Sequence, residues 1–322
     1  MTGRLVCVAV AAIGFALSLR TPLHAQDQSA SPKADLTIRA PAGESEIVIT
    51  TTSRLAGAIH SLTWKGKEFI NSADHGRQLQ SASSFSWEGN HWAESFNPTE
   101  AGSRDDGAGA TSTSRLLHSV ATSNSLQTTV QMAFWLAPEQ KSEGHPALNK
   151  TKLSDHLLTK RVQIGLPDLP QVIRYDVSFS VPLTKRPTFA QFEGLTGYMP
   201  SEFSVFSTFR SKVGTLEPIS DGPGEQSEPL VFSTENGSHA IGIYSPQQPS
   251  PGFENAGYGR WKFGPERVVK WNSVFRLRRP EGIESREYSF RNFVVVGDRE
   301  TVRTTLAKLH QQHPKPSVRD DR

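Results

Sequence analysis

Two polar stretches in the first third of the chain carry side chains that can move protons or bind anions. "SADHGRQLQ" contains His75 and Arg77, and "SFNPTEAGSRDDG" contains Asn97 and Glu100. Histidine can act as an acid or a base near neutral pH, and arginine offers a planar fork of donors. We interpret His75 and Glu100 as candidate catalytic groups, and Arg77 and Asn97 as candidate ligand-binding groups. The alternative is a pair of hydrated turns, because Asn-Pro and Asp-Gly are ordinary turn sequences.

A third polar stretch, "QFEGLTGYMP", lies in the middle of the chain and holds Gln191, Glu193 and Tyr198. On a strand, Gln191 and Glu193 would point to the same face. We take Glu193 as a candidate general base, and Gln191 and Tyr198 as candidate ligand-binding groups, because a tyrosine ring can stack while its hydroxyl donates. The alternative is an exposed strand end.

A glycine-rich stretch, "FENAGYGRWKFGPER", adds Tyr258, Arg260 and Trp261 as further candidate ligand-binding groups. Aromatic rings beside a few placed polar groups are typical of small-molecule sites. The alternative for Trp261 is packing at the edge of the core, where most tryptophans lie.

The sequence offers only weak evidence for a metal site and no motif for a cofactor. Asp105 and Asp106 could hold Ca²⁺ through their oxygens, although two adjacent carboxylates are commonly a hydrated turn. The chain has no His-Glu-x-x-His, EF-hand, P-loop, dinucleotide fingerprint or Gly-x-Ser-x-Gly motif. We therefore expect no cofactor and no resident metal, and we disfavour serine hydrolase, kinase and dehydrogenase functions.

The N-terminus has the layout of a secretory signal peptide. A basic residue, Arg4, precedes an apolar run over 5–17, and a small-residue exit ends at Ala25. The run is too short to span a bilayer as a mature helix, so we expect no membrane span after cleavage. The sequence predicts a signal over 1–25 and an exported product, periplasmic or extracellular. The sole cysteine, Cys7, lies inside this signal, so the mature chain has no disulfide.

The charge balance of the chain argues against nucleic acid as a partner. The 322 residues hold 35 lysines and arginines against 32 acidic residues. Removal of Arg4 and Arg20 with the signal leaves 33 basic side chains against the same 32 acidic ones. A mature chain so close to neutral is not expected to bind nucleic acid.

Alternation of apolar and polar residues, the mark of strands buried on one face, is the main structural signal. It is clearest over 127–136, 172–181 and 268–277. Asn236-Gly237 and Lys65-Gly66 sit between such runs and predict hairpin turns. We therefore expect an all-β fold, a large antiparallel β-sandwich.

One segment predicts a helix. In "GDRETVRTTLAKLHQQHPKP", Asp298 is a candidate N-cap, and apolar residues recur from Val302 to Leu309 before Pro314. We expect a single C-terminal helix over 298–312. The expected layout is a signal over 1–25, a linker over 26–43, one sandwich domain over 44–313 and a disordered tail over 314–322. The longest loop is expected over 87–113, and loops of that length are commonly functional.

Two stretches resemble the strand pattern of galactose mutarotase-like proteins. They are "RLAGAIHSLTWKGKEFINS" and "SVPLTKRPTFAQFEGLTGYMP". The resemblance implies the supersandwich fold of that superfamily and a saccharide ligand. The Asn-His-x-Tyr-Phe-Asn signature of true mutarotases is absent, and the nearest stretch, "FEGLTGYMP", has no histidine. No catalytic histidine is therefore carried over.

These observations together favour an exported carbohydrate-active protein, with epimerase, glycosidase and lyase chemistry all open. The alternative is a non-catalytic carbohydrate-binding or structural β-sandwich. The oligomeric state is open. We expect the loops around His75 and Glu100 to lie side by side as one wall of the site. The segment 189–198 would form the opposite wall, with Glu193 facing Arg77.

Overall fold

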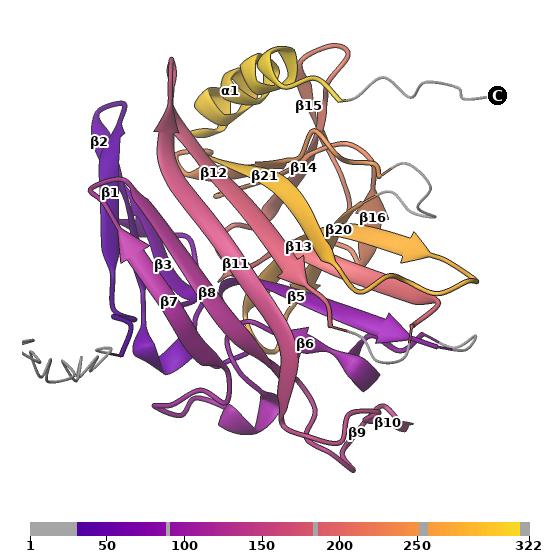
Figure 1. Cartoon of the computed structure of the whole chain (residues 1–322). Helices are drawn as coiled ribbons and strands as arrows, with labels where there is room; N and C mark the ends of the chain where they lie inside the picture. The colour runs from indigo at the N-terminus through magenta and orange to yellow at the C-terminus, as the bar shows by residue number, and fades with distance from the viewer. Residues whose placement is uncertain (1–30, 88–90, 183–185, 251–256, 316–322) are drawn as a thin grey trace, which may run out of the picture. The chain divides into compact units, whose positions relative to one another are not determined.

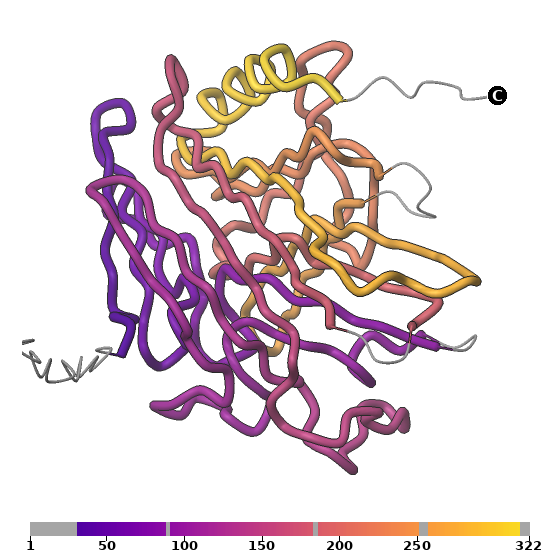
Figure 2. Tube along the Cα trace, in the orientation of Figure 1, coloured from indigo at the N-terminus to yellow at the C-terminus, as the bar shows by residue number. Residues whose placement is uncertain are grey.

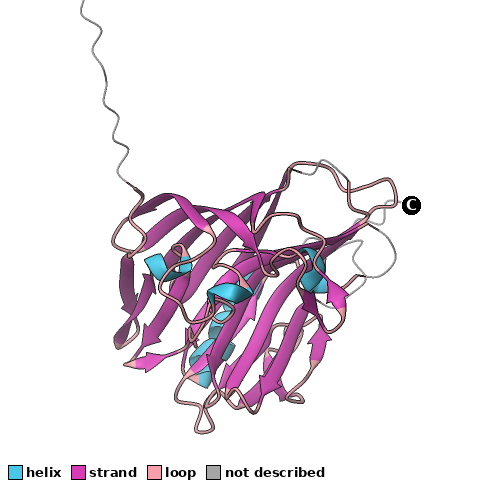
Figure 3. Cartoon of the chain, turned by 90° about the horizontal axis from the view of Figure 1, so that it is seen from below, coloured by secondary structure: helices cyan, strands magenta, loops and turns pink. Residues whose placement is uncertain are grey.

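The computed structural model consists mainly of β-strands, which are coloured magenta in Figure 3. The strands form where apolar and polar residues alternate along the sequence. The structure describes residues 31–87, 91–182, 186–250 and 257–315, and the predicted signal lies outside them. The described residues from Pro32 onward form one compact unit. No helix in the described part of the chain has the length and apolarity needed to cross a bilayer.

The first layer of the fold is a series of antiparallel strands that contains both early and late parts of the chain. Its central strands are β5, β13 and β20, which come from three distant parts of the sequence. In order of pairing, the layer consists of β1 (Thr37–Ala42), β2 (Ser45–Thr51), β3 (Ile59–Trp64), β5 (Leu79–Ser86), β13 (Phe189–Pro200), β20 (Val268–Arg278), β19 (Tyr258–Phe263) and β16 (Gly224–Gln226).

The second layer is also antiparallel and places β21 beside β12, a pairing that can be followed in Figure 2. In order of pairing it consists of β7 (Arg115–Ala121), β8 (Ser125–Phe134), β11 (Leu153–Leu166), β12 (Leu169–Ser180), β21 (Glu287–Gly297), β18 (Ala240–Tyr244), β17 (Leu230–Ser233), β14 (Val205–Arg210) and β15 (Thr215–Pro218).

Short elements connect and decorate the layers. Strand β6 (Pro98–Thr99) pairs with both β5 and β8, and so joins the two layers into one hydrogen-bonded network. The remaining elements are β4 (Lys67–Glu68), the hairpin of β9 (Lys141–Ser142) and β10 (His145–Pro146), and the 3-10 turns η1 (Ser53–Leu55), η2 (Ala93–Phe96) and η3 (Arg104–Asp106).

The main core lies between the two layers. Inward-facing residues of β13, such as Phe192 and Leu195, are packed there with Tyr175 and Phe179 of β12 and Trp271 of β20. All five side chains are at most 1% exposed. Burying large apolar side chains of this kind contributes roughly 1.5–3 kcal/mol each, and supplies the stability that disulfides would otherwise give.

Helix α1 (Arg299–Gln312) covers the far side of the second layer, where it is drawn in yellow in Figure 1. Its apolar stripe of Val302, Leu306 and Leu309 packs into a second cluster with Tyr244 and Phe293. Asp298 caps the helix, since its side chain accepts a hydrogen bond from Thr301 N at 2.7 Å.

The expected fold class, an all-β sandwich with one C-terminal helix, is confirmed. The two hairpin turns are also confirmed: Lys65 and Gly66 both have positive φ between β3 and β4, and Asn236-Gly237 joins β17 to β18. The long loop expected over 87–113 instead holds η2, β6 and η3 within its described part.

One boundary differs from the expected layout. The predicted linker over 26–43 contains strand β1, which pairs along its whole length with β2. The polar composition of this segment hides the strand, because only Ile38 and Ala42 of β1 are fully buried, with Ala40 partly buried against the core. Of the predicted disordered tail, residues 316–322 lie outside the described part of the chain.

Candidate functional site

A β-bulge in β13 determines which side chains face away from the core. Before the bulge, Phe192 packs into the core and Glu193 points to the opposite face; after it, Leu195 packs into the core and Thr196, although only 2% exposed, points to the same face as Glu193. The pairing with β5 jumps from Glu193–Ala82 to Thr196–Gln80, and that with β20 shifts at the same place. Gly194 is the extra residue, and it brings Glu193 and Thr196 to one face.

Glu193 and Thr196 line a cleft on the outer face of the first layer, with a volume of about 160 Å³. The Thr196 hydroxyl donates a hydrogen bond to Glu193 Oε2. The cleft combines carboxylates, one amine, amides, hydroxyls and aromatic rings. Its lining is Gly76, Gln80, Ala82, Ser83, Ser84, Ala93, Glu94, Asn97, Thr99, Trp135, Glu193, Thr196, Tyr198 and Lys270.

Neighbouring strands place a cation between two aromatic rings at one end of the cleft. Lys270 of β20 pairs across the sheet with Tyr198 of β13 on one side and Trp261 of β19 on the other. Its Nζ lies 5.3 Å from the centre of the Tyr198 ring and 5.1 Å from that of Trp261. Both are cation–π contacts, which hold the amine and the two rings in a row.

Neighbouring groups keep the amine of Lys270 positively charged. Burial alone would lower its pKa, but the surrounding Tyr198, Glu193 and Glu94 outweigh burial and raise the pKa above its ordinary value. Lys270 is therefore a cation at neutral pH. The charged residues of the lining are Glu94, Glu193 and Lys270, so the ionised cleft carries a net charge of −1.

Two further predicted residues belong to this face. Asn97 lines the cleft, and its amide donates to Ser83 O at 2.7 Å. Gln191 lies beyond Glu193 on β13 and accepts a hydrogen bond from Arg276 Nε at 2.8 Å. Arg276 also binds both carboxylate oxygens of Glu225, at 2.7 and 2.9 Å. Gln191 is thus tied to an ion pair beside the cleft.

His75 does not line the cleft, which corrects its assignment as a catalytic group. It is 1% exposed, and its ring nitrogens lie 2.7 Å from Gly107 O and 2.8 Å from Arg54 O. A backbone carbonyl oxygen thus lies within hydrogen-bond distance of each ring nitrogen. The contact with Gly107 does place the two loops side by side, as expected.

Glu100 is also away from the cleft, so its catalytic assignment is corrected in the same way. Its side chain is 0% exposed and forms an ion pair with Lys160, also 0% exposed. Glu100 Oε2 accepts from Ser81 N at 3.0 Å, and Lys160 Nζ donates to Gly57 O at 3.1 Å. A carboxylate enclosed in this manner has no access to a ligand.

Three residues predicted to bind a ligand have structural partners instead. Arg77 pairs with Asp74 at 3.0 Å rather than facing Glu193. Tyr258 is fully buried, and its hydroxyl accepts from Ser245 N at 2.7 Å. Arg260 donates from Nε to Ser220 O at 2.7 Å. Their sequence neighbourhoods resembled a site because glycine-rich turns and ligand loops share a composition.

Both members of the acidic pair suggested for Ca²⁺ accept hydrogen bonds from protein groups. Asp106 accepts hydrogen bonds from Ser103 N and from the backbone and hydroxyl of Thr113, at 2.7–2.9 Å. Asp105 accepts from Gln140 Nε2 at 2.7 Å. Among the residues that the structure describes, no cluster of three or more His, Cys, Asp or Glu side chains is placed to hold a metal.

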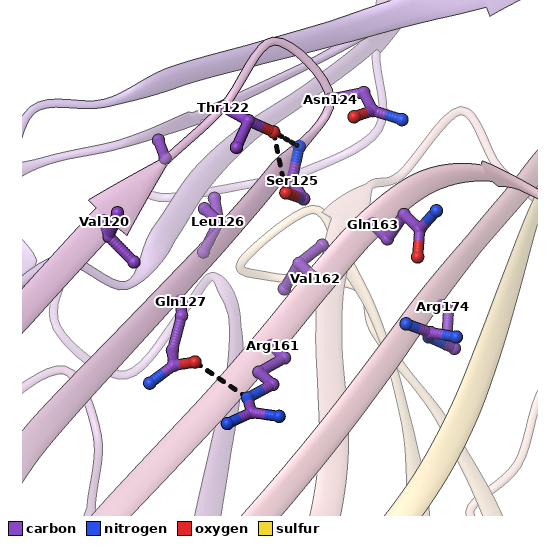
Figure 4. A pocket seen from close by; sticks show the side chains of 11 residues that line it. Val120, Thr122, Asn124, Ser125, Leu126, Gln127, Arg161, Val162, Gln163 and Arg174 are labelled. Atoms are coloured by element: carbon purple, nitrogen blue, oxygen red, sulfur yellow. Dashed lines mark hydrogen bonds between the residues drawn. The ribbon is translucent and has the colours of Figure 1, made fainter.

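A second hollow, of about 330 Å³, lies between β7, β8, β11 and β12 (Figure 4). Its lining includes Arg161 and Arg174, and Arg161 donates to Gln127 at 2.7 Å. The lining contains no carboxylate or histidine. This hollow therefore lacks an acid–base group, although it is larger than the cleft beside Glu193.

Two histidines near the cleft predict a dependence of stability on pH. Burial, followed by the charges of Arg276 and Arg278, lowers the pKa of His91 to about 4, and burial lowers that of His156 to about 4. The ordinary value is 6.5, so between pH 6.5 and 4 the unfolded chain binds more protons than the folded chain. The free energy of unfolding is expected to be constant above this range and to fall as pH drops through it.

Urea unfolding at pH 7.0, 5.5 and 4.5 measures this effect. His156→Leu should flatten the dependence, while His118→Leu, at an exposed position, should leave it as in the parent. An unchanged slope in His156→Leu would contradict the lowered pKa.

Sequence reasoning missed several lining residues, notably Gln80, Glu94, Trp135 and Lys270. The sequence indicates Lys270 only weakly as a site residue. It is a polar residue in the alternating strand β20, and it pairs with Tyr198 of β13. Trp135 packs directly against Gly76, where a Cβ would lie 2.8 Å from its ring. The space left by the missing side chain at Gly76 is thus filled by the Trp135 ring.

Comparison with known proteins finds structural matches of low sequence identity. No protein-family model matches the chain, and no curated protein matches it. Solved structures with a similar fold include the Slr1438 protein from Synechocystis (10% identity, TM-score 0.42, 84% of this chain and 98% of that one) and a putative mutarotase, YeaD, from Salmonella typhimurium (10%, 0.39, 84% and 98%). An alpha-mannosidase from Enterococcus faecalis is also similar (10% identity, TM-score 0.49), with 86% of this chain matching 32% of that chain. At about 10% identity and TM-scores below 0.5, these matches assign the chain to no superfamily and carry no statement about its activity.

Proposed function

We propose that the protein binds a neutral saccharide in the cleft beside Glu193 and acts on it by acid–base chemistry. The observation that carries the proposal is the composition of the cleft. Two carboxylates, two amides, several hydroxyls and the rings of Tyr198 and Trp135 surround one small cavity. Sugars offer many hydroxyl groups and apolar ring faces, which such polar groups and aromatic platforms recognise.

The size and charge of the cleft narrow the class of saccharide. A volume of about 160 Å³ is below the roughly 300–1,000 Å³ of common ligand pockets, and favours a single sugar ring over a long chain. The net charge of −1 from Glu94, Glu193 and Lys270 disfavours a uronate or a sulfated sugar, whose own negative charge would be repelled.

Each charged residue has a distinct role in the proposed chemistry. Glu193 accepts the Thr196 hydroxyl through Oε2, and its carboxylate can take a proton from a sugar hydroxyl. Lys270 stays cationic and stabilises the negative charge that forms on the sugar oxygen. Glu94, carried by η2 rather than by the sheet, supplies a second acid or base in the same cleft. Proton removal and return by two carboxylates is common to isomerisation and hydrolysis.

The proposal is tested by presenting the protein with neutral monosaccharides and disaccharides and with their uronate counterparts. Thermal shift reports binding, and NMR of the sugar reports a change at the anomeric carbon or a new product. We expect neutral sugars to raise the melting temperature and uronates to leave it unchanged. Stabilisation by uronates alone would contradict the charge argument, and no response to any sugar would contradict the function.

We further propose that the protein is exported, on the basis of the signal-like layout of residues 1–25. Expression with its full N-terminus in a bacterial host, followed by N-terminal sequencing of the secreted or periplasmic fraction, should give a first residue near Gln26. Recovery of the chain in the cytoplasm with Met1 still present would contradict export.

A further inference from the structure

The buried ion pair of Glu100 and Lys160 belongs to a chain of hydrogen bonds that ends at the bulge in β13. Ser81 is the central member of this chain. It lies on β5 directly opposite the bulge, because Ala82 pairs with Glu193 and Gln80 pairs with Thr196. The Ser81 hydroxyl donates to Gly194 O at 2.9 Å.

The bulge itself creates the need for this hydrogen bond. An extra residue in a strand is left without its regular ladder partner. Gly194 is buried, and a buried carbonyl without a hydrogen bond costs free energy. A side chain at position 194 is excluded, since a Cβ would lie 2.7 Å from the Phe275 ring. The strand partner Ser81 therefore supplies the bond that the bulge requires.

Tyr175 connects Ser81 to the buried ion pair. Its hydroxyl lies 3.0 Å from Ser81 Oγ, and both residues are fully buried. The Tyr175 hydroxyl also interacts with the Glu100 carboxylate, so it lies between Ser81 and the ion pair. Burial, then the negative charge of Glu100, raise the pKa of Tyr175 far above its ordinary value, so the phenol keeps its proton.

The ion pair fixes the backbone of Ser81. Glu100 Oε2 accepts from Ser81 N at 3.0 Å, and Glu100 N donates to Ser81 O at 3.1 Å. Glu100 is therefore bound to both backbone polar groups of Ser81. Lys160 supplies the positive charge that a buried carboxylate requires.

We propose that Ser81, Tyr175, Glu100 and Lys160 form a positioning network that holds the bulge in place, so that Glu193 and Thr196 face the cleft together. None of the four residues lines the cleft, so they act through Gly194 and not on the ligand. The inference rests on the proposed role of Glu193, and it extends that role to residues in the core.

The test compares two variants of the network with two matched controls. Ser81→Ala removes the hydroxyl that binds Gly194 O, and Tyr175→Phe removes the hydroxyl that contacts Ser81 Oγ. Ser154→Ala is the control for the first, because Ser154 is buried and its Oγ donates to Met132 O at 2.6 Å. Tyr244→Phe is the control for the second, because the buried Tyr244 donates to the backbone carbonyl of residue 313 at 2.5 Å.

The readouts do not require a ligand. The ¹³C resonance of the Glu193 carboxyl carbon reports its hydrogen bonding, and hydrogen exchange of the backbone amides over 195–197 reports the ladder beside the bulge. In Ser81→Ala we expect the carboxyl resonance to move and these amides to exchange about tenfold faster. Tyr175→Phe should change both in the same direction. The two controls should lower the melting temperature and leave both readouts as in the parent.

Unchanged readouts in Ser81→Ala, or equal changes in Ser154→Ala, would overturn the positioning network. Saccharide binding is measured separately by thermal shift with the neutral monosaccharides used above. If Glu193 responds to Ser81→Ala while no sugar binds to the parent, the network stands and the proposed function fails. If a sugar binds to the parent, we expect Ser81→Ala to weaken its affinity more than Ser154→Ala does.

Discussion

Replacement of Lys160 by methionine is expected to lower the free energy of unfolding by about 3–5 kcal/mol, because it leaves the carboxylate of Glu100 buried without a cation. Both side chains of the pair are 0% exposed, and methionine fills a similar volume. Urea unfolding at pH 7 measures the loss.

Two further variants separate the charge effect from packing. In Lys160→Met combined with Glu100→Gln, no buried charge remains, so the double variant should be more stable than Lys160→Met alone. Arg39→Met disrupts a pair with Glu46 whose side chains are 57% and 47% exposed, and it should cost less than about 1 kcal/mol. A loss in Lys160→Met as small as that in Arg39→Met would show that the buried pair carries no stabilising charge interaction.

The largest functional effect is expected at Glu193. Glu193→Gln keeps the shape of the side chain and an oxygen that can accept the Thr196 hydroxyl, but it removes the base. If the cleft converts a saccharide, turnover should fall by about 10²–10⁴-fold, the usual contribution of a positioned acid or base. The measurement is the rate of sugar conversion by NMR, with the melting temperature recorded alongside.

Glu287→Gln is the matched control for this variant. Glu287 also accepts a side-chain hydroxyl, in this case Ser180 Oγ of β12 at 3.1 Å, but it lies on β21 in the second layer, outside the cleft. Its replacement should leave turnover at the parent level. Full activity in Glu193→Gln would exclude Glu193 as the base and leave Glu94 as the candidate base in the cleft.

The strands and the helix were predictable because their signals are local. Alternation in β12 and β20 follows from burial on one face, and the cap at Asp298 with the stripe of α1 follows from helix geometry. Strand β1 was missed because its two core residues do not distinguish it from a polar linker. Which strands become neighbours, β5 beside β13 above all, depends on long-range pairing that has no local sequence signal.

The candidate site was predictable in part, for the same reason. Glu193, Tyr198 and Asn97 line the cleft, but strict alternation would place Glu193 and Tyr198 on opposite faces, since they are five residues apart. The bulge that brings them together was not inferred from Gly194. His75 and Glu100 were misassigned because burial depends on the tertiary packing of their loops, whereas their sequence context is as polar as that of a ligand loop.

The bulge at Gly194 also limits how this chain can change length over evolution. Deletion of Gly194 would give regular alternation and keep Glu193, Thr196 and Tyr198 on the cleft face, whereas deletion of Gly197 would turn Tyr198 toward the core and Met199 toward water. One codon lost after the bulge would thus disturb the cleft and the hydrophobic core at once. Homologues that keep this cleft should therefore conserve the spacing between Thr196 and Tyr198, and a change of length by one residue in this strand should be found at the bulge.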